Sequence, residues 1–402
     1  IACVDSPVGK ASATQLCIDD SSYLPGLNEL AESITAYDCR AFIQLHHAGR
    51  QTSLAVNGGH TPVAPSPIAC RLMQVVPQEL DLEGIRRIQH KFVKSARYAL
   101  LAGFDGVELH AAHGYLISQF LSPYSNRRQD QYGGSTENRA RFLTEIIEAI
   151  KKSLPDLAVG VRLNVADFVP GGLELDEGCK LAILVEKAGA DYINVSNGIY
   201  ESGQTNIEPA PYKEGWRMHL AAAVKQVVSV PVIGGGVIRH PAVAEELIAS
   251  GQTDFVWVGR GMLADPEWAG KAIGGNARAI RPCISCNTCI GRSFSGLHIR
   301  CAVNPYATRE LLWPRAGNLQ DIRVLVAGAG PAGMQAALSL KQAGAEVVLL
   351  EQGDRLGGQL NIASVPPHKE KLAWLSEYLT EAVYAADIKV VLNTVFTVGH
   401  LD

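Results

Sequence analysis

The sequence ENRARFLTEIIEAIKKSLPDLAVGVRLN, residues 137–164, joins a helix pattern to a strand pattern and sets the fold class. Apolar residues recur at helical spacing through residues 137–154, and a nearly continuous apolar run follows at 158–164. A similar run, FDGVELH, precedes both at 104–110. A strand, a helix and a second strand in this order predict two parallel strands joined by a crossover helix.

The same alternation extends toward both ends of the chain. Another helix is predicted over residues 178–190, and further strands are predicted at 1–5, 41–47, 191–197, 230–236 and 254–260. Nearly continuous apolar runs are typical of parallel strands that are buried on both faces. The strands total seven, one fewer than a closed (β/α)8 TIM barrel contains. We therefore expect an α/β barrel whose first strand is missing from the front of this chain.

Composition excludes several classes of protein. The 402 residues are 47% hydrophobic and 19% charged, with a net charge of −4, which is typical of a globular protein. A mildly acidic chain lacks the basic surface that nucleic-acid binding needs. No apolar run is long enough to span a membrane, so no membrane partner is expected. We predict a cytoplasmic enzyme with a small-molecule substrate, and the sequence leaves homo-oligomerisation open.

Four of the nine cysteines lie close together in a segment of weak periodicity. Cys283, Cys286, Cys289 and Cys301 follow the spacing C-x2-C-x2-C-x11-C. Such a set of thiolates can bind a structural zinc ion or an iron–sulfur cluster. Three cysteines at two-residue intervals favour the cluster. We assign residues 1–275 to the barrel, 276–317 to a cluster-binding segment and 318–402 to a partial dinucleotide-binding domain.

A glycine loop follows the predicted strand IRVLVA at 322–327. Gly328, Gly330 and Gly333 form G-x-G-x-x-G at the start of a predicted helix, where backbone N–H groups can approach a pyrophosphate. Glu351 ends the next predicted strand, where a carboxylate accepts a hydrogen bond from a ribose hydroxyl. The pattern predicts the start of a Rossmann-like domain.

Polar residues cluster at the carboxyl ends of the barrel strands, where barrel enzymes place their active sites. Gln44 and Arg162 lie late on their strands, although a buried arginine often serves a salt bridge instead. The loops at 233–238 and 258–263 are glycine-rich, with Arg260 available for a phosphate. Another predicted strand ends with His110, and His113 and Tyr115 follow it. The three residues are candidates for metal ligands, catalytic donors or core polar groups. His46, His47 and Arg50 lie at or just after the end of the strand predicted at 41–47. These residues either line the open end of the barrel or cap their strand.

Several of these segments resemble a known family. QLHHAGRQ (44–51), HAAHGYLISQFLSP (110–123), VGVRLN (159–164) and VGRGMLADP (258–266) are similar to the old yellow enzyme family of FMN barrels. The cysteine segment and VAGAGPAG (326–333) narrow the resemblance to the multidomain iron–sulfur branch, which includes 2,4-dienoyl-CoA reductase, enoate reductase and trimethylamine dehydrogenase.

The resemblance implies cofactors and residue roles. Gln44 and Arg162 would contact the FMN ring, and Gly236, Gly259 and Arg260 would hold its phosphate. The four cysteines would bind a 4Fe–4S cluster, and the glycine loop would bind FAD or another adenine nucleotide such as ADP. His110 and His113 would donate hydrogen bonds to a substrate carbonyl oxygen, and Tyr115 would supply a proton.

The function implied by this resemblance is reduction of an activated C=C bond. Electrons would pass from NAD(P)H through FAD and the cluster to FMN. An amine dehydrogenase or demethylase of the trimethylamine dehydrogenase type is the alternative enzyme. An electron-transfer subunit without a substrate site is the non-catalytic alternative.

Overall fold

The computed structural model describes residues 1–311 and 319–400. The chain divides into two compact units, each described below by itself. The first unit consists of Ile1–Ile207, Gly215–Gly236 and Glu245–Trp257. The second consists of Glu208–Glu214, Val237–Ala244 and the chain from Val258 onward. The predicted domain boundary near 318 lies outside the described residues, and both predicted boundaries remain predictions.

A parallel sheet forms the centre of the first unit. Its strands are β1 (Ala2–Cys3), β2 (Leu16–Cys17), β3 (Phe42–His46), β6 (Gly106–Ala111), β7 (Ala158–Asn164), β8 (Tyr192–Ser196), β9 (Val232–Gly234) and β10 (Phe255–Val256). The strand order is β10-β9-β8-β7-β6-β3-β1-β2. All seven predicted strands are present, and the short β2 was not predicted. The unit has the TIM-barrel-like fold expected from the sequence.

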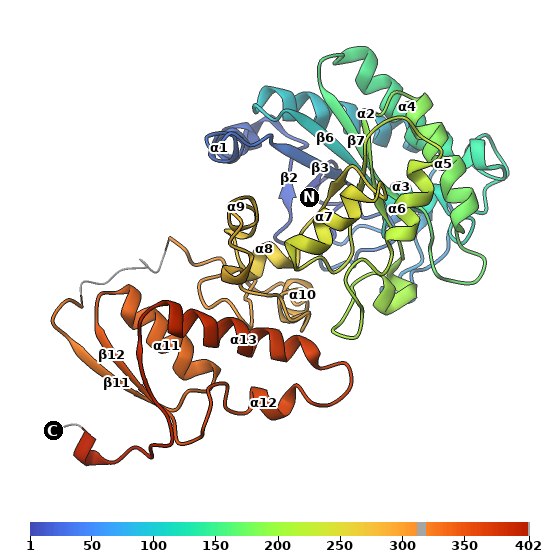
Figure 1. Cartoon of the computed structure of the whole chain (residues 1–402). Helices are drawn as coiled ribbons and strands as arrows, with labels where there is room; N and C mark the ends of the chain where they lie inside the picture. Colours follow the sequence, from blue (N-terminus) through green and yellow to red (C-terminus); the bar gives the residue numbers. More distant parts are fainter. Residues whose placement is uncertain (312–318, 401–402) are drawn as a thin grey trace. The chain divides into compact units, whose positions relative to one another are not determined.

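Helices surround this sheet (Figure 1). They are α1 (Leu24–Thr35), α2 (Leu82–Leu101), α3 (Leu116–Leu121), α4 (Thr136–Ser153), α5 (Leu175–Lys187) and α6 (Met218–Lys225). Two short strands, β4 (Val63–Ala64) and β5 (Gln78–Glu79), form a separate pair. Helix α7 (Pro241–Ala249) has residues in both units.

The helix α4 shows why its sequence folds as predicted. The Ser135 side chain accepts a hydrogen bond from the backbone N–H of Asn138 and so caps the first turn. Lys151 and Lys152 lie in the last turn, where positive charge favours the helix dipole. Phe142 is fully buried and stacks on Phe120, with 4.2 Å between the ring centroids. Capping and one buried face together fix this helix.

The second unit contains a three-stranded parallel sheet, β11-β12-β13. Its strands are β11 (Arg323–Ala327), β12 (Glu346–Leu350) and β13 (Lys389–Val391), and its helices are α8 (Arg260–Ala264), α9 (Trp268–Ile273), α10 (Thr288–Phe294), α11 (Pro331–Gln342), α12 (Leu360–Ala363) and α13 (Glu370–Ala385). Met334, Val347 and Leu379 belong to its buried core. Helix α10 begins inside the cysteine segment, which was expected to be irregular.

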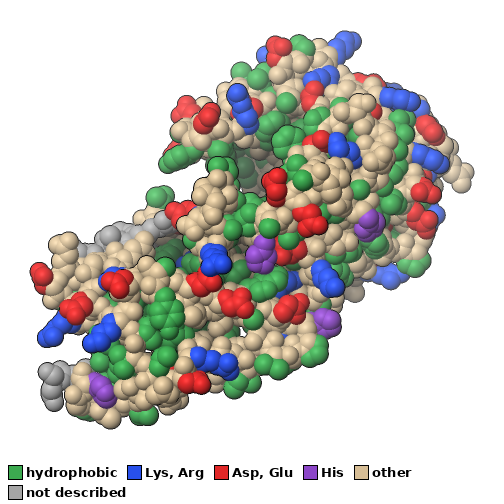
Figure 2. All heavy atoms as spheres, in the orientation of Figure 1, with side chains coloured by type: hydrophobic (Ala, Val, Ile, Leu, Met, Phe, Trp, Pro, Cys, Tyr) green, Lys and Arg blue, Asp and Glu red, His purple; other side chains and the backbone are tan. Residues whose placement is uncertain are grey.

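The surface drawn in Figure 2 carries side chains of both charges in mixed positions. Within the described residues, no helix is both long and apolar enough to cross a membrane.

Candidate functional site

The predicted histidine–tyrosine cluster is assembled after strand β6 of the first unit. His110 lies on β6, and the ring centroids of His113 and Tyr115 lie 5.1 and 4.9 Å from its own. His46, at the end of β3, packs edge-on against Tyr115 at 4.3 Å. His113 adopts a left-handed φ of 62°. The three predicted residues therefore share one site, with His46 beside them.

Hydrogen bonds tie the cluster to strand β8 and to the loop that follows it. The Nε2 atom of His113 lies 2.7 Å from the Ser196 hydroxyl. The hydroxyl oxygens of Tyr115 and Tyr200 lie 3.0 Å apart. The Nδ1 atom of His110 is buried without a hydrogen-bond partner among the described residues. A buried imidazole with an unused nitrogen is available to a ligand.

Burial controls the charge of this site. It lowers the pKa of His46, His110 and His113 well below 6.5, and the positive charge of Arg162 lowers the pKa of His110 and His113 further. Burial also raises the pKa of Tyr115, while the hydrogen bond between Tyr115 and Tyr200 opposes that rise. At neutral pH the imidazoles are uncharged and the Tyr115 phenol keeps its proton. The site therefore offers neutral donors rather than cations.

Glu108 lies on β6, two residues before His110, and its carboxylate is the centre of a small group of polar side chains. Its carboxylate accepts hydrogen bonds from Gln44 Nε2 at 2.5 Å and from Asn194 Nδ2 at 2.9 Å. Gln44, predicted to face a flavin ring, is thus engaged with Glu108 in this structure. Arg162 pairs with His110 in the strand register, and its guanidinium lies 5.0 Å from the centre of the Trp257 ring.

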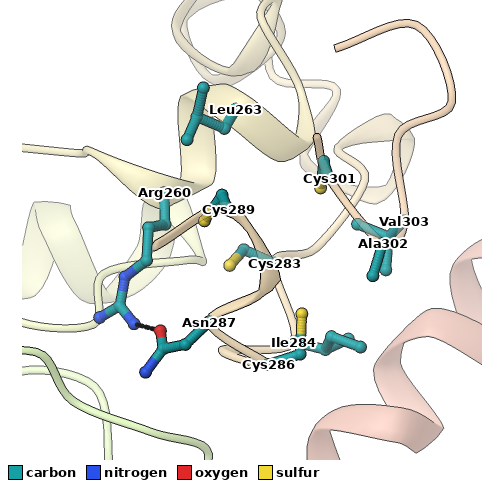
Figure 3. Close-up of a pocket in the computed structure, with 10 residues that line it drawn as sticks. All are labelled: Arg260, Leu263, Cys283, Ile284, Cys286, Asn287, Cys289, Cys301, Ala302 and Val303. Carbon is teal, nitrogen blue, oxygen red and sulfur yellow. Dashed lines mark hydrogen bonds between the residues drawn. The ribbon is translucent and has the colours of Figure 1, made fainter. Parts of the chain in front are cut away.

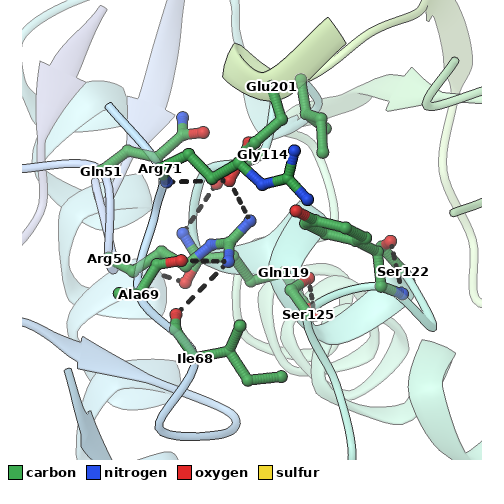
Figure 4. A network of polar contacts seen from close by, with 12 residues as sticks. Arg50, Gln51, Ile68, Ala69, Arg71, Gly114, Gln119, Ser122, Ser125 and Glu201 are labelled. Atoms are coloured by element: carbon green, nitrogen blue, oxygen red, sulfur yellow. Dashed lines mark hydrogen bonds and ion pairs between the residues drawn. The ribbon is translucent and has the colours of Figure 1, made fainter. Parts of the chain in front are cut away.

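A buried ion pair holds the segment that carries Tyr200 (Figure 4). Arg50 Nη2 lies 3.0 Å from Glu201 Oε1, and both side chains are 1% exposed. Arg50 also donates to the carbonyl oxygens of Ile68 and Ala69, each at 3.3 Å. Arg50, placed by the sequence at the barrel mouth or at a strand cap, instead anchors the loop after β8.

The second unit brings the four predicted cysteines to one pocket (Figure 3). All four thiols are free, and Cys283 is 8% exposed. Burial raises the pKa of the Cys289 and Cys301 thiols. Among the residues that the structure describes, no group of three or more possible ligands is arranged to hold a single metal ion.

Arg260 also lines this pocket. Its guanidinium pairs with the Glu208 carboxylate at 2.9 Å and contacts the Asn287 side chain. Arg260 was predicted to bind a phosphate together with Gly236 and Gly259. Gly236 belongs to the first unit, with a φ of 155° and its Cα beside Arg217, whereas Gly259 precedes α8 in the second unit. The phosphate role of these three residues stays a prediction.

The glycine loop lies between β11 and α11. A Cβ at Gly328 or Gly330 would meet no atom within 4 Å, so open space faces both residues. A Cβ at Gly333 would lie 1.9 Å from the Gly328 carbonyl oxygen, so only glycine lets the helix approach the loop. Glu351 accepts hydrogen bonds from the backbone N–H groups of Ala329 and Gly353, at 2.7 and 2.8 Å.

Comparison with known proteins assigns both regions. Residues 2–278 match the family described as NADH:flavin oxidoreductase / NADH oxidase. The chain belongs to this NADH:flavin oxidoreductase family. Residues 323–387 match the family described as FAD dependent oxidoreductase. The presence of both domains in one chain agrees with the multidomain branch that the sequence motifs resemble.

The individual relatives of this chain have several different activities. An NADH oxidase of Thermoanaerobacter brockii is 48% identical over 391 residues, which cover 96% of this chain and 60% of the relative. A cinnamate reductase of Clostridium sporogenes is 34% identical, over 94% of this chain and 59% of the relative. The chain therefore spans about 60% of the length of these curated relatives.

Solved structures agree with this family. A 2-naphthoyl-CoA reductase in complex with 2-naphthoyl-CoA superimposes with a TM-score of 0.94 at 30% identity, covering 98% of this chain and 62% of that one. A histamine dehydrogenase from Rhizobium sp. 4-9 gives a TM-score of 0.91 at 27% identity, covering 100% of this chain and 59% of that one.

The residues of this family member fit flavin cofactors. Buried polar atoms without a partner among the described residues include His110 Nδ1, Asn194 Oδ1 and Trp257 Nε1 in the barrel unit. Such atoms suit a polar ring system. The open space over Gly328 and Gly330 suits a pyrophosphate. The shared pocket of four free thiols suits a cluster that is larger than one ion.

Sequence reasoning missed Tyr200, Ser196 and Glu108. Tyr200 meets Tyr115 across 85 residues of sequence, and Ser196 meets His113 across 83. Both contacts join the end of β6 to the end of β8, the two strands that lie on either side of β7 in the parallel sheet. The order of strands in a barrel predicts that such ends meet, so polar residues after β8 were the available signal.

Proposed function

We propose that the chain belongs to an NAD(P)H-dependent flavin oxidoreductase that reduces the activated C=C bond of an α,β-unsaturated carbonyl or enoate compound. The observation that carries the proposal is the cluster of His110, His113 and Tyr115 at the carboxyl ends of the barrel strands. The family membership supports a flavin in this barrel. The cinnamate reductase relative supports an enoate as substrate.

Each side chain of the cluster has a step that suits its protonation state. FMN, when bound, would supply the hydride for the β-carbon of the substrate. His110 and His113 would donate N–H hydrogen bonds to the carbonyl oxygen, where negative charge develops in the transition state. Tyr115 would then donate its phenol proton to the α-carbon as a general acid. The lowered histidine pKa values and the raised Tyr115 pKa support these neutral, protonated forms.

The remaining residues would bind the other cofactors. Gln44, Arg162, Gly236, Gly259 and Arg260 would hold FMN. The four cysteines would hold a 4Fe–4S cluster, which transfers single electrons when bound. Gly328, Gly330, Gly333 and Glu351 would hold FAD or another adenine nucleotide, and NAD(P)H would be the electron donor.

The test supplies electrons chemically, because the chain spans about 60% of its relatives. The purified chain is loaded with FMN, reduced with dithionite without oxygen, and mixed with 2-cyclohexenone. We expect oxidised flavin absorbance to return with the enone and not with cyclohexanone, which lacks the C=C bond. If no enone or enoate reoxidises the flavin, C=C reduction is wrong.

An amine dehydrogenase is the alternative, supported by the histamine dehydrogenase neighbour. In that case trimethylamine or histamine would bleach the oxidised flavin without any added reductant. We expect no bleaching, because the His110–His113 pair is suited to a carbonyl oxygen rather than to an amine.

A further inference from the structure

The cysteine loop of the second unit has an unusual backbone. Ser285 and Asn287 alternate with the first three predicted ligands, and both have left-handed φ values, 54° and 57°. Residues other than glycine adopt this conformation at a cost, so surrounding contacts must hold them there. Each of the two is contacted by an arginine side chain from outside the loop, Ser285 by Arg239 and Asn287 by Arg260.

Arg260 lines the cysteine pocket, whereas Arg239 lies behind the loop and makes two hydrogen bonds with it. Its Nε donates to the Cys283 carbonyl oxygen at 3.1 Å, and its Nη2 donates to the Ser285 hydroxyl at 3.2 Å. Nη1 donates to its neighbour's carbonyl, that of Ile238, at 2.7 Å. The Trp268 indole donates to the Arg239 carbonyl oxygen at 2.7 Å and so fixes its backbone. This guanidinium is held rigidly against the first cysteine of the loop.

The guanidinium of Arg239 donates only to uncharged groups. The Glu214 carboxylate nevertheless accepts a hydrogen bond from the Arg239 backbone N–H at 2.5 Å, and Glu214 and Glu208 act on the charge of the side chain from a distance. The side chain is buried, with the residue 4% exposed, and all three acceptors are neutral oxygens. Within the described part of the chain, its guanidinium is in no ion pair with a carboxylate. Arg260, by contrast, pairs directly with Glu208 at 2.9 Å. A buried cation is costly unless an anion lies nearby.

An iron–sulfur cluster bound by four cysteine thiolates is an anion. Hydrogen bonds and nearby charges influence the reduction potential of such a cluster. We propose that Arg239 is the counter-charge and positioning residue of the cluster that Cys283, Cys286, Cys289 and Cys301 would bind. It raises the reduction potential of the cluster and holds the cysteine loop in its ligating shape. This inference rests on the proposed cluster.

The test compares three variants of the iron-loaded chain. Arg239→Met removes the charge but keeps a side chain of similar length. Arg239→Lys keeps the charge but cannot donate several hydrogen bonds from one planar group. The control, Arg278→Met, removes an exposed arginine of the same unit. The readouts are iron per chain, and the midpoint potential from a redox titration followed by EPR. Neither readout depends on substrate turnover.

We expect Arg239→Met to shift the ratio of reduced to oxidised cluster against reduction by on the order of tenfold, or about 59 mV for one electron. Arg239→Lys should stay near the wild-type potential but lose iron faster to a chelator. Arg278→Met should match the wild type in both readouts.

An unchanged potential in Arg239→Met with full iron content overturns the counter-charge role. If Arg239→Met binds no iron, Arg239→Lys decides, and a midpoint potential well below that of the wild type despite the retained charge would overturn the role. If the wild-type protein binds zinc or no iron, the proposed cluster is wrong. That outcome differs from an iron-loaded cluster whose potential does not depend on Arg239.

Discussion

The hydroxyl oxygens of Tyr115 and Tyr200 lie 3.0 Å apart, although 85 residues separate them in the sequence. This contact joins the predicted proton donor to the loop after strand β8. The hydrogen bond opposes the rise in the pKa of Tyr115 that burial causes. Tyr200 thereby makes Tyr115 a stronger acid than a buried phenol would be alone.

Tyr200→Phe is therefore expected to slow proton delivery by Tyr115. A single neutral hydrogen bond contributes about 1 kcal/mol, which corresponds to a rate loss of roughly fivefold. The measurement is the rate of enone-dependent flavin reoxidation across pH. Tyr98→Phe, on helix α2, is the matched control. A Tyr200→Phe enzyme with the wild-type rate and pH profile would show that the contact is only structural.

Arg50→Met should destabilise the first unit, because it leaves the Glu201 carboxylate buried and without its ion-pair partner. Removing one member of a buried ion pair costs about 3–5 kcal/mol. Urea unfolding measures the loss. The double variant Arg50→Met with Glu201→Gln should recover a large part of it, since no uncompensated charge remains. Equal stability of the single and double variants would contradict this role for the pair.

The buried histidines predict how stability depends on pH. Folding lowers the pKa of His46, His110 and His113, so below about 6.5 the unfolded chain takes up protons that the folded chain does not. Their contribution is complete above pH 6.5, and the free energy of unfolding falls as pH falls below it, by about 1.4 kcal/mol per pH unit per histidine.

His46→Asn is the variant that checks this dependence. The free energy of unfolding of this variant should depend less steeply on pH than that of the wild type, by close to one proton, when unfolding is measured at about pH 7.5 and about pH 5.5. The His60→Asn variant, at an exposed position, controls for the substitution itself. A His46→Asn slope equal to that of the wild type would mean that His46 is protonated in the folded chain.

Two glycines of the nucleotide loop should respond in opposite ways. Gly330 has a φ of −71° and open space at its Cβ position, so Gly330→Ala should fold normally but weaken FAD binding. Gly333→Ala would place its Cβ 1.9 Å from a carbonyl oxygen and should lower the melting temperature of the second unit. Fluorescence titration with FAD and thermal melts separate the two effects. Full FAD affinity in Gly330→Ala would argue against a nucleotide at this loop.

The sequence predicted the elements whose signals are local. Helix α4 combines a serine cap with one apolar face, and β7 is a nearly continuous apolar run, so both match their predicted ranges closely. The strands β9 and β10 are shorter than predicted, at three and two residues, because apolar character continues beyond the ladder contacts. Helix α10 was missed because cysteine, glycine and serine obscure its period.

The candidate site divides in the same way. His110, His113 and Tyr115 were found because they lie within six residues of one another after a strand. Tyr200 and Arg239 act through contacts across 85 and 44 residues, which no local pattern records. The ion pairs of Arg50 and Arg260 depend on partners that only the folded chain brings close.

The most direct test of the proposed chemistry is the reoxidation of reduced flavin by 2-cyclohexenone in His110→Phe, which keeps a ring but removes the N–H donor, compared with the wild type. Removing one donor to a developing oxyanion typically costs 10²–10³ in rate. We expect a loss of about 100-fold, with the flavin absorbance spectrum and FMN content unchanged. Reoxidation by His110→Phe at the wild-type rate would contradict a carbonyl-binding role for the histidine pair and with it the proposed reduction of an activated C=C bond.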